Sequence, residues 1–424
     1  MSFKVEIVGG GLAGVEAAYQ LAKRKINVDL YEMRPHQDAK AHHSDKLAEL
    51  VCSNSLKSDD IFKASGLLKK EMEVLDSIIL KNAYKCRVPA GQSLSVDREK
   101  FSSLITKEIE ENPYINIIRE EYSKISKSNI VIIASGPLTS NKLSYNLEKL
   151  IDKENLYFYD AAAPLIEADS INYDIAFFKS RYDKGGADYL NLGMNREEFD
   201  NFYLNLINAK KHPLKEFEKE IYFQACMPIE VIGKKNPKSL LFGPLKPVGL
   251  EKDNKRFHAV VQLRKDNEEG SIYNMVGFQT NLLFEEQKRV FRMIPGLEKA
   301  KFLRCGVMHR NSFINSPKCL NINLQVKDDD NVFIAGLLSG VEGYVESFST
   351  GLIAALSVYS KLKDKNTTPI PKETMIGSLI YYICNYSKVN FQPINANFGI
   401  YSGDKKDPLK SIELIKNWYK ENEF

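Results

Sequence analysis

The chain has 424 residues, of which 43% are hydrophobic and 27% are charged, and its formal net charge is +4. Its length predicts two or three domains with sizeable cores, and the small net charge gives no sign of a basic nucleic-acid-binding protein. No apolar stretch reaches the roughly 18 residues that a membrane span needs. The first residues lack the basic-then-apolar layout of a signal peptide, so we expect a cytoplasmic protein.

The first predicted unit covers residues 3–34, which read FKVEIVGGGLAGVEAAYQLAKRKINVDLYEMR. Val5, Ile7 and Val8 form a buried strand, and small apolar residues follow at the 3.6-residue spacing of a helix. A second strand ends the unit. This strand–helix–strand pattern predicts a parallel sheet with a right-handed crossover.

After this unit, stretches with clear strand or helix patterns are separated by a long region of short strand candidates and loops. The stretch 64–83 predicts one helix, and 128–140 predicts a buried strand that ends in a glycine–proline turn. From about 166 to 325, short strand candidates lie among loops rich in Gly, Pro and Asn, which predicts an insertion domain. Residues 330–362 return to strand, glycine loop and helix, and the residues from about 365 onwards are expected to be helical and exposed.

A glycine fingerprint, Gly9-x-Gly11-x-x-Gly14, lies between the first strand and its helix. Such glycines allow a tight turn, a close approach of a pyrophosphate and close helix–strand packing, with the phosphates on the helix N-terminus. Glu32 ends the second strand, where a carboxylate can accept hydrogen bonds from ribose hydroxyls. The predicted cofactor residues of this unit are Gly9, Gly10, Gly11, Leu12, Ala13, Gly14 and Glu32.

The cofactor could be FAD or NAD. A second glycine-rich loop, FIAGLLSGVEGYVES at 333–347, favours FAD, because the last strand–loop–helix of two-ended flavoproteins presents a helix N-terminus to the cofactor. We therefore predict an α/β fold class: a Rossmann-like FAD-binding domain with a doubly wound parallel sheet, interrupted by an α+β insertion domain. The predicted boundaries are 1–165 and 326–424 for the FAD-binding domain, and 166–325 for the insertion domain.

The six cysteines are scattered, without a CxxC pair or a Cys/His cluster at zinc spacing, so we expect neither a metal nor disulfides. Most are expected to be inert buried thiols, and one or two could be nucleophiles. The adjacent His42 and His43 are interpreted as loop surface. The cysteines are Cys52, Cys86, Cys226, Cys305, Cys319 and Cys384.

Several stretches, in order along the chain, resemble one family. They include VGGGLAGVEAA, LVCSNSLKS, VPAGQSLSVDREKFS, ASGPLTS, ACMPIEV, AVVQLRKDN, GVMHRNSFINSP and GVEGYVES. The chain is thereby identified as a member of the TrmFO family, folate- and FAD-dependent RNA (uracil-5-)-methyltransferases related to the GidA flavoproteins. The resemblance implies that 5,10-methylenetetrahydrofolate donates a carbon to C5 of a uridine in RNA, that reduced FAD is the reductant, and that NAD(P)H recharges the flavin.

The resemblance also implies roles for particular residues. Uracil C5 becomes nucleophilic when a thiolate adds to C6, and a base must then remove the C5 proton. The two functional cysteines of the family match Cys226, expected to attack C6, and Cys52, expected near the flavin in proton removal or carbon transfer; the reverse assignment stays open. Glu230 is a lesser candidate for a base. His309 and Arg310 are implied in folate binding, and the implied cofactor residues also include Gly136, Gly336, Gly340, Gly343 and Tyr344.

The RNA target is left open between the T-loop uridine at position 54 of tRNA and a uridine of 23S rRNA. Leu338 stands where family members usually have glutamine, and the loop before residue 66 lacks the usual Asn-Ala pair, which hints at an rRNA-modifying paralogue. Lysine-rich stretches at 208–215 and 233–238 are candidate RNA contacts. An FAD-dependent NAD(P)H oxidoreductase without RNA chemistry, and a GidA-like partner subunit, are alternatives that the two cysteines and the chain length disfavour. Monomer and dimer both stay open.

Overall fold

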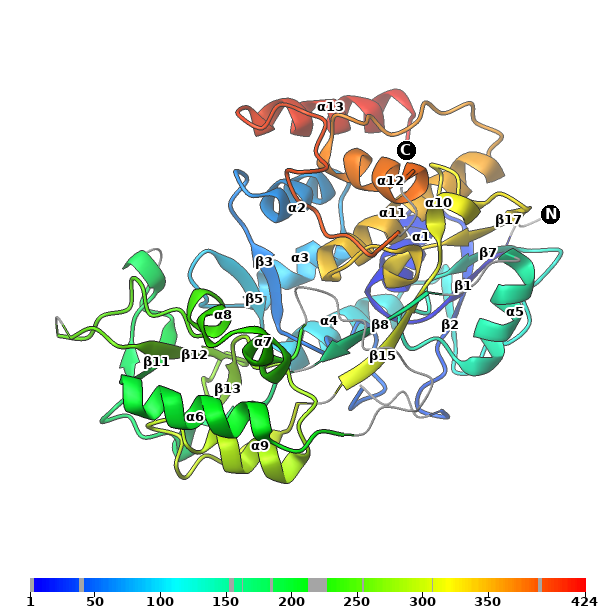
Figure 1. The fold of residues 1–424 in the computed structure, drawn as a ribbon. Coiled ribbons are helices and arrows are strands. Elements are labelled where there is room, and N and C mark those ends of the chain that lie inside the picture. The colour runs from blue at the N-terminus through cyan, green and yellow to red at the C-terminus, as the bar shows by residue number, and fades with distance from the viewer. Residues whose placement is uncertain are drawn as a thin grey trace.

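The structure is a computed structural model. It describes residues 4–37, 42–151, 156–161, 163–183, 186–212, 227–253, 255–306, 308–387 and 391–424, with the backbone alone for 156–161 and 308–311. Two separate hydrophobic cores form. One joins residues between 5 and 151 to residues between 313 and 418, and the other joins residues between 166 and 300. Figure 1 shows the second group of elements beside and below the first.

The first core surrounds a six-stranded sheet. Five neighbouring strands are parallel, as the sequence predicts, and β16 closes one edge in the antiparallel direction. The backbone hydrogen-bond register pairs Val5 with Val28 on one side and with Ile130 on the other. In spatial order the strands are β16 (Gln325–Val326), β17 (Asp329–Ile334), β7 (Ile130–Ile133), β1 (Lys4–Val8), β2 (Asn27–Tyr31) and β6 (Ile115–Ile118).

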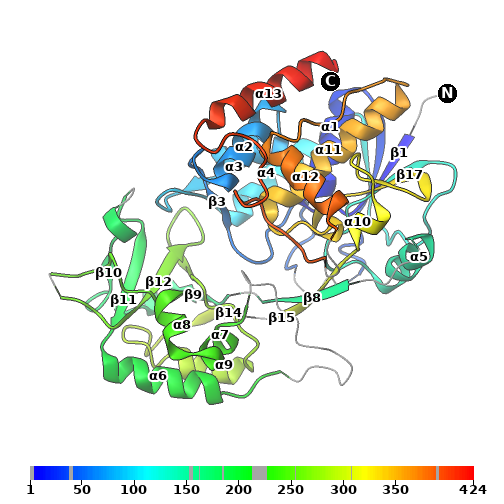
Figure 2. The ribbon, with the colours of Figure 1, turned by 45° about the horizontal axis from the view of Figure 1, so that its top comes forward.

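Two helices from opposite ends of the chain pack together beside this sheet. They are α1 (Leu12–Lys23) and α11 (Tyr344–Leu362), whose ribbons lie side by side in both views (Figures 1 and 2). A Cβ atom on Gly351 would overlap the carbonyl oxygen of Ala13, so the two helices can approach this closely only with glycine there. The N-termini of both helices consequently lie near the carboxyl ends of the central strands.

The single helix predicted over 64–83 is wrong. The chain forms α2 (Ala64–Val74) and α3 (Ile78–Lys85), separated by Asp76, whose φ of +60° no helix accommodates. Ser77 then caps α3, its hydroxyl accepting from the Leu80 N–H at 3.3 Å. The cap signal outweighs the continuous apolar periodicity.

Near these helices lies a small sheet of β3 (Ser55–Ser58), β5 (Ser93–Val96) and β4 (Arg87–Val88), followed by α4 (Arg98–Glu110). Helix α5 (Asn141–Ile151) follows β7. The C-terminal part contains α10 (Ser316–Cys319), α12 (Met375–Asn385) and α13 (Pro408–Glu421). The expectation that this part is exposed is wrong for α12, most of which is buried in the first core.

The second core lies under an antiparallel six-stranded sheet. Its order is β10 (Phe177–Phe178), β11 (Tyr189–Met194), β12 (Ala259–Lys265), β13 (Ile272–Met275), β9 (Leu165–Glu167) and β14 (Phe302–Arg304). Among the described residues, four helices contribute buried side chains to it: α6 (Arg196–Asn208), α7 (Ile229–Lys235), α8 (Pro237–Phe242) and α9 (Phe284–Phe291). Figure 2 shows this α+β unit as a separate group of elements, below and to the left of the first unit.

A two-stranded antiparallel ribbon joins the two units. Strand β8 (Leu156–Ala161) leads out of the first, and β15 (Met308–Phe313) returns beside it, with Leu156 opposite Phe313. Residues 313–326 contribute to the first core. The predicted boundaries at 165/166 and 325/326 stay a prediction. No helix in the described part of the chain is both long and apolar enough to cross a membrane.

Candidate functional site

The turn between β1 and α1 is built by its glycines. Gly9 has φ of +106°, and its N–H donates to the Tyr31 carbonyl at 2.8 Å. A Cβ on Gly14 would overlap the Gly9 carbonyl oxygen, whereas one on Gly11 would meet no atom within 4 Å. Gly9 and Gly14 therefore shape the turn, and Gly11 leaves open space in front of it.

That open space faces the N-terminus of α1. Gly11 is the N-cap and has no side chain to cap the first turn of the helix. The first N–H groups of a helix lack intrahelical acceptors, and the helix dipole adds a partial positive charge there. This end of α1 is consequently suited to a phosphate group.

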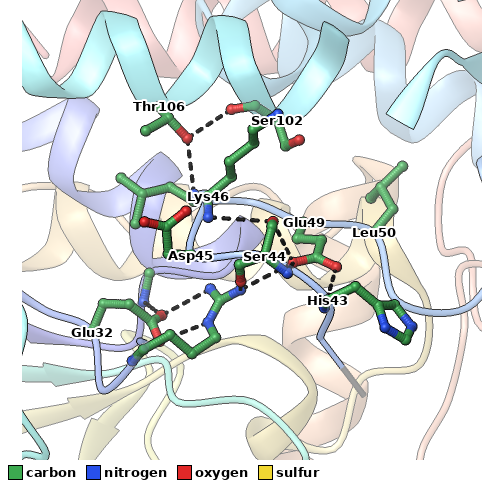
Figure 3. A network of polar contacts seen from close by, with 12 residues as sticks. Glu32, His43, Ser44, Asp45, Lys46, Glu49, Leu50, Ser102 and Thr106 are labelled. Carbon is green, nitrogen blue, oxygen red and sulfur yellow. Dashed lines mark hydrogen bonds and ion pairs between the residues drawn. The ribbon is translucent and has the colours of Figure 1, made fainter. Parts of the chain in front are cut away.

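Glu32, directly after β2, is held in a dense network (Figure 3). Its Oε2 accepts from the Gly10 N–H at 2.9 Å and from the Arg34 guanidinium at 3.1 Å. Its Oε1 accepts from the backbone N–H and the Nε of Arg34, at 3.0 and 2.9 Å. Both carboxylate oxygens thus have two protein donors, and Glu32 fixes the glycine turn as well as facing the cavity.

The same arginine extends the network to the loop before Cys52. Arg34 donates to the Ser44 carbonyl at 3.1 Å and to Glu49 at 3.3 Å. Glu49 in turn accepts from the N–H groups of His43 and Ser44 (Figure 3). Burial acts to raise the pKa of Glu32, but the hydrogen bonds and charge of Arg34 outweigh burial and lower that pKa. The Glu32 carboxylate is therefore ionised at neutral pH.

A cavity extends from the glycine turn to the start of α11. Eight of the twelve predicted cofactor residues line it: Gly9, Gly11, Leu12, Ala13, Glu32, Gly136, Gly336 and Tyr344. The other four shape the backbone nearby. Gly10 and Gly14 do so in the turn, and Gly340 and Gly343 adopt φ of +82° and +115° before α11. The open Gly11 and Gly136 and the uncapped helix fit the diphosphate of a dinucleotide.

Cys52 lies in a loop beside this cavity, and hydrogen bonds from two sides hold that loop in place. The N–H groups of Cys52 and Ser53 donate to the Tyr344 hydroxyl at 2.8 and 3.2 Å. The Cys52 carbonyl accepts from Arg98 at 2.9 Å and from Arg304 at 3.2 Å. Tyr344 belongs to the first unit and Arg304 to the second, so the loop is fixed where the two units meet.

The other predicted catalytic and folate residues are described less fully. Cys226 lies outside the described residues. His309 and Arg310 lie on β15, where their backbones pair with Asp160 and Tyr159 of β8, and their side chains lie outside the described part. The structure therefore places the Cys52 loop beside the cavity, where Val51 and Tyr344 line it, and all four assignments stay predictions.

Residues on both sides of the stretch 213–226 are bound to the segment 279–281. On one side the His212 N–H donates to the Asn281 carbonyl at 2.9 Å, and on the other the Ile229 N–H donates to the Gln279 carbonyl at 2.7 Å. The two acceptors, Gln279 and Asn281, are two residues apart. Because an extended residue rises about 3.4 Å, they lie within about 7 Å of each other.

Glu230 reinforces the second attachment. It is fully buried, and its carboxylate accepts from the Thr280 hydroxyl at 2.8 Å and the Asn281 N–H at 2.9 Å. Burial raises the pKa of Glu230, an effect that these hydrogen bonds oppose. These contacts give Glu230 a structural role: it fixes the chain that follows Cys226 to residues 280 and 281.

Three of the other cysteines are less exposed than Cys52, whereas Cys305 is partly exposed as Cys52 is. Cys86, Cys319 and Cys384 are buried, and burial raises the pKa of Cys384 to about 12, as expected of inert thiols. Leu338 is buried at 2% exposure and does not line the cavity, although its neighbour Leu337 does. Within the described ranges, no group of three or more His, Cys, Asp and Glu residues could hold a metal.

Sequence reasoning missed the arginines of this site. Arg34 could have been found as a cation two residues after the terminal acid of the second strand. Arg98, Arg264 and Arg304 lie far apart in the sequence, and only the fold brings them to the Cys52 loop. Two of them stand in stretches that carry the family resemblance, VDREKFS and AVVQLRKDN.

The parallel sheet, the glycine turn and a cavity shared by α1 and α11 define a Rossmann-like, FAD-binding class of protein. The family model described as glucose inhibited division protein A matches residues 4–366. The structure of GidA from Aquifex aeolicus, form II crystal, superposes with a TM-score of 0.74 at 17% identity, covering 99% of this chain and 74% of that one. This structural similarity supports the fold.

Curated relatives are much closer in sequence. The methylenetetrahydrofolate–tRNA-(uracil-5-)-methyltransferase TrmFO of Natranaerobius thermophilus is 53% identical over 415 residues, covering 97% of this chain and 96% of the relative. The protein of the same name from Halalkalibacterium halodurans is 54% identical over 429 residues, covering 98% of each. The chain therefore belongs to the TrmFO family, within the broader GidA family.

Proposed function

We propose that the protein is a methylenetetrahydrofolate-dependent tRNA (uracil-5-)-methyltransferase with FAD as its cofactor. The observation that carries this proposal is the 53–54% identity, over nearly the whole of both chains, to relatives with that name. The open glycine cradle at the N-terminus of α1 supports FAD binding. The relatives are named for tRNA, which favours the tRNA uridine over 23S rRNA as the target.

FAD, once reduced by NAD(P)H, supplies the electrons that convert a folate-derived methylene group into a methyl group. The residues of this chain that would hold FAD are those of the cradle, with Gly11 and Gly136 beside the diphosphate and Glu32 fixing the turn. Overall, the uridine loses one hydrogen at C5 and gains a methyl group, folate leaves as tetrahydrofolate, and NAD(P)H is oxidised.

The cysteines activate the uracil ring. The Cys226 thiolate adds to C6 and its electron pair raises the electron density at C5, which attacks the one-carbon unit. A base then takes the C5 proton, and the C–H electron pair stays on the pyrimidine and expels tetrahydrofolate, which leaves a methylene group on C5. Once that methylene group has been reduced to a methyl group, Cys226 leaves with its electron pair and the C5–C6 double bond is restored. Cys52 is the proposed base because its loop borders the cavity through Tyr344. His309 and Arg310 are the proposed folate contacts.

The proposal also covers the RNA substrate, the cellular location and the oligomeric state of the protein. RNA is the substrate, the lysines of 233–238 are proposed contacts with it, and the protein is proposed to work in the cytoplasm without a bound metal. Both a monomer and a dimer are compatible with this activity. An oxidoreductase without RNA chemistry would need neither Cys52 nor Cys226.

The decisive experiment incubates the purified protein with NADPH, methylenetetrahydrofolate and either a tRNA transcript or a 23S rRNA fragment. Mass spectrometry of the digested RNA should find 5-methyluridine in the tRNA, and Cys226→Ala should form none. In parallel, 5-fluorouracil-substituted tRNA should be trapped covalently, because fluorine blocks loss of the C5 substituent. Methylation of the rRNA fragment alone, or covalent trapping by Cys226→Ala, would contradict the proposal.

A further inference from the structure

Three arginines converge on the Cys52 loop from both units of the molecule. Arg98 begins α4 of the first unit, Arg264 lies on β12 and Arg304 on β14 of the second. Arg98 and Arg304 both donate to the Cys52 carbonyl. Arg264 donates to the Ser53 hydroxyl at 2.9 Å and the Asn54 side-chain oxygen at 3.0 Å. Three consecutive residues of the loop are thus held by guanidinium groups.

Only one carboxylate in the described part of the chain pairs with these three cations. Asp266 binds Arg98 in a bidentate manner, at 2.8 and 3.1 Å. Among the described residues, Arg264 and Arg304 have no carboxylate oxygen within 4.0 Å. Three cations and one anion leave two positive charges at the loop, and Arg264 is only 7% exposed.

Uncompensated buried charge is costly and is seldom kept without a function. The Nε of Arg304 is also buried without an acceptor among the described residues. Burial lowers the pKa of both Arg264 and Arg304, and nearby Cys52 and Asp266 oppose that effect. The loop that these cations surround carries a cysteine, whose side chain can become an anion.

We propose that Arg264 and Arg304 are positioning residues for Cys52, which fix its loop against the insertion unit and hold its sulfur as a thiolate. This inference rests on the proposed role of Cys52 as the base. A thiolate is favoured beside arginine side chains. In the step, the C5 proton moves to the sulfur and the thiolate becomes a thiol. The C–H electron pair stays on the pyrimidine and expels the carrier of the one-carbon unit.

Two other groups at the loop, Asp266 and Tyr344, also affect the charge and the orientation of Cys52. Asp266 is negative but is shared with Arg98 in a close bidentate pair. The Tyr344 hydroxyl, on the other side, accepts the loop N–H groups and so orients the backbone of Cys52. The two arginines of the insertion unit therefore decide the balance of charge at Cys52, and their removal changes it most.

The test compares Arg304→Gln and Arg264→Gln with Arg304→Lys and Arg264→Lys, which keep the charge. Lys301→Gln is the matched control, because Lys301 is a cation near β14 whose side chain is 72% exposed. The first readout is the rate at which iodoacetamide alkylates Cys52 as a function of pH, measured by peptide mass spectrometry without RNA. The second is tRNA methylation, and the third is FAD content with NADPH-driven flavin reduction.

We expect the glutamine variants to move the alkylation profile of Cys52 about one pH unit upward, as loss of a neighbouring opposite charge should. Methylation at pH 7 should fall about tenfold and recover at higher pH, while FAD content and flavin reduction stay normal. The lysine variants should lie close to wild type, as should Lys301→Gln. Identical alkylation profiles in wild type and glutamine variants would overturn the inference, as would an equal loss of methylation at every pH.

The two proposals fail in different ways. If the wild type alkylates with the expected dependence on Arg264 and Arg304 but forms no 5-methyluridine, the proposed function is wrong and the electrostatic inference holds. If the wild type methylates tRNA and the glutamine variants match it at every pH, the inference is wrong and the function stands. The lysine variants and the FAD content separate both outcomes from simple misfolding.

Discussion

The glycine turn before α1 and the loop around Cys52 both lie beside the same cavity, but they are built in opposite ways. The cradle depends on missing side chains: Gly14 has room for no Cβ, and Gly11 leaves space for a ligand. The loop depends on long charged side chains that reach across from another unit. The comparison teaches that the glycine turn beside α1 is determined by a short local stretch, whereas the contacts of the Cys52 loop require residues that only the fold brings together.

The largest expected effect tests the cradle. Gly14→Ala should cost about 3 kcal/mol or more in the free energy of unfolding, because a Cβ would overlap the Gly9 carbonyl and force β1 and α1 apart. Gly11→Ala should keep the stability of the apoprotein, because its Cβ meets no atom, yet weaken FAD binding at least about tenfold. Thermal unfolding and flavin titration measure the two. Equal effects of the two substitutions would break the division between shaping and ligand-facing glycines.

The next effect tests the seam between the units. Asp266→Asn removes the only carboxylate among the described partners of the three arginines, so we expect a loss of about 3 kcal/mol in unfolding free energy. Glu269→Gln, on the same turn, is the comparison, because no ion pair with Glu269 is described. Urea denaturation of both variants measures the difference. Stability equal to wild type for Asp266→Asn would mean that the buried cations are neutralised elsewhere.

A smaller effect tests the anchor after Cys226. Glu230→Ala leaves the Thr280 hydroxyl and the Asn281 N–H without their acceptor, at a cost of about 2 kcal/mol. We expect covalent trapping of 5-fluorouracil tRNA to slow while NADPH-driven flavin reduction is unchanged. Glu285→Gln, whose side chain is 85% exposed, is the control. A parallel loss of flavin reduction would show that the anchor supports the whole molecule.

The last effect is a pH dependence that comes from two buried carboxyl groups of the first core. Burial raises the pKa of Glu16 and of Glu71 to about 7, the latter where it accepts from the N–H groups that begin α12. Because the folded protein binds these protons more tightly than the unfolded chain, stability is greatest below about pH 4.5 for these groups. It should fall as pH rises to about 7, by on the order of 2 kcal/mol per group.

Glu71→Gln should remove its part of this pH dependence, and unfolding free energies at several pH values between 5 and 8 measure it. Glu73→Gln, on the same helix and partly exposed, is the control. A pH slope that is the same in Glu71→Gln and wild type would show that Glu71 stays ionised in the folded protein.

Much of the first unit could be predicted because its signals are local. The strand, glycine turn, helix and terminal acid of 3–34 fall within one continuous stretch, and α1 and β2 form there. The helix break at Asp76 was missed because apolar spacing continues across it, although the Asp-Ser pair is a cap signal. The burial of α12 was missed because it packs against elements that lie elsewhere in the sequence, such as α2, whose Glu71 accepts from the first N–H groups of α12.

The surroundings of Cys52 could be predicted only in part. Cys52 was found through the family resemblance, and the structure places its loop beside the cavity. Its arginine partners could not be found, because residues 98, 264 and 304 meet only after two sheets have formed and packed. Glu32 was predicted from its position at the end of the second strand. That Gly10 and Arg34 donate to its carboxylate oxygens depends on side-chain conformations, which no sequence pattern specifies.

The ribbon of β8 and β15 has a consequence for how such a molecule can change over generations. Because the chain leaves at Leu156 and comes back at Phe313 on facing strands, the intervening segment is joined to the first unit in the chain at two adjacent points, besides the contacts of residues such as Asp266 and Arg304 across the seam. Insertions, deletions or exchange of that whole segment leave the spacing of the parallel strands untouched. The half that binds the cofactor can thus be inherited unchanged while the attached half diverges, provided that it still presents arginines to the Cys52 loop.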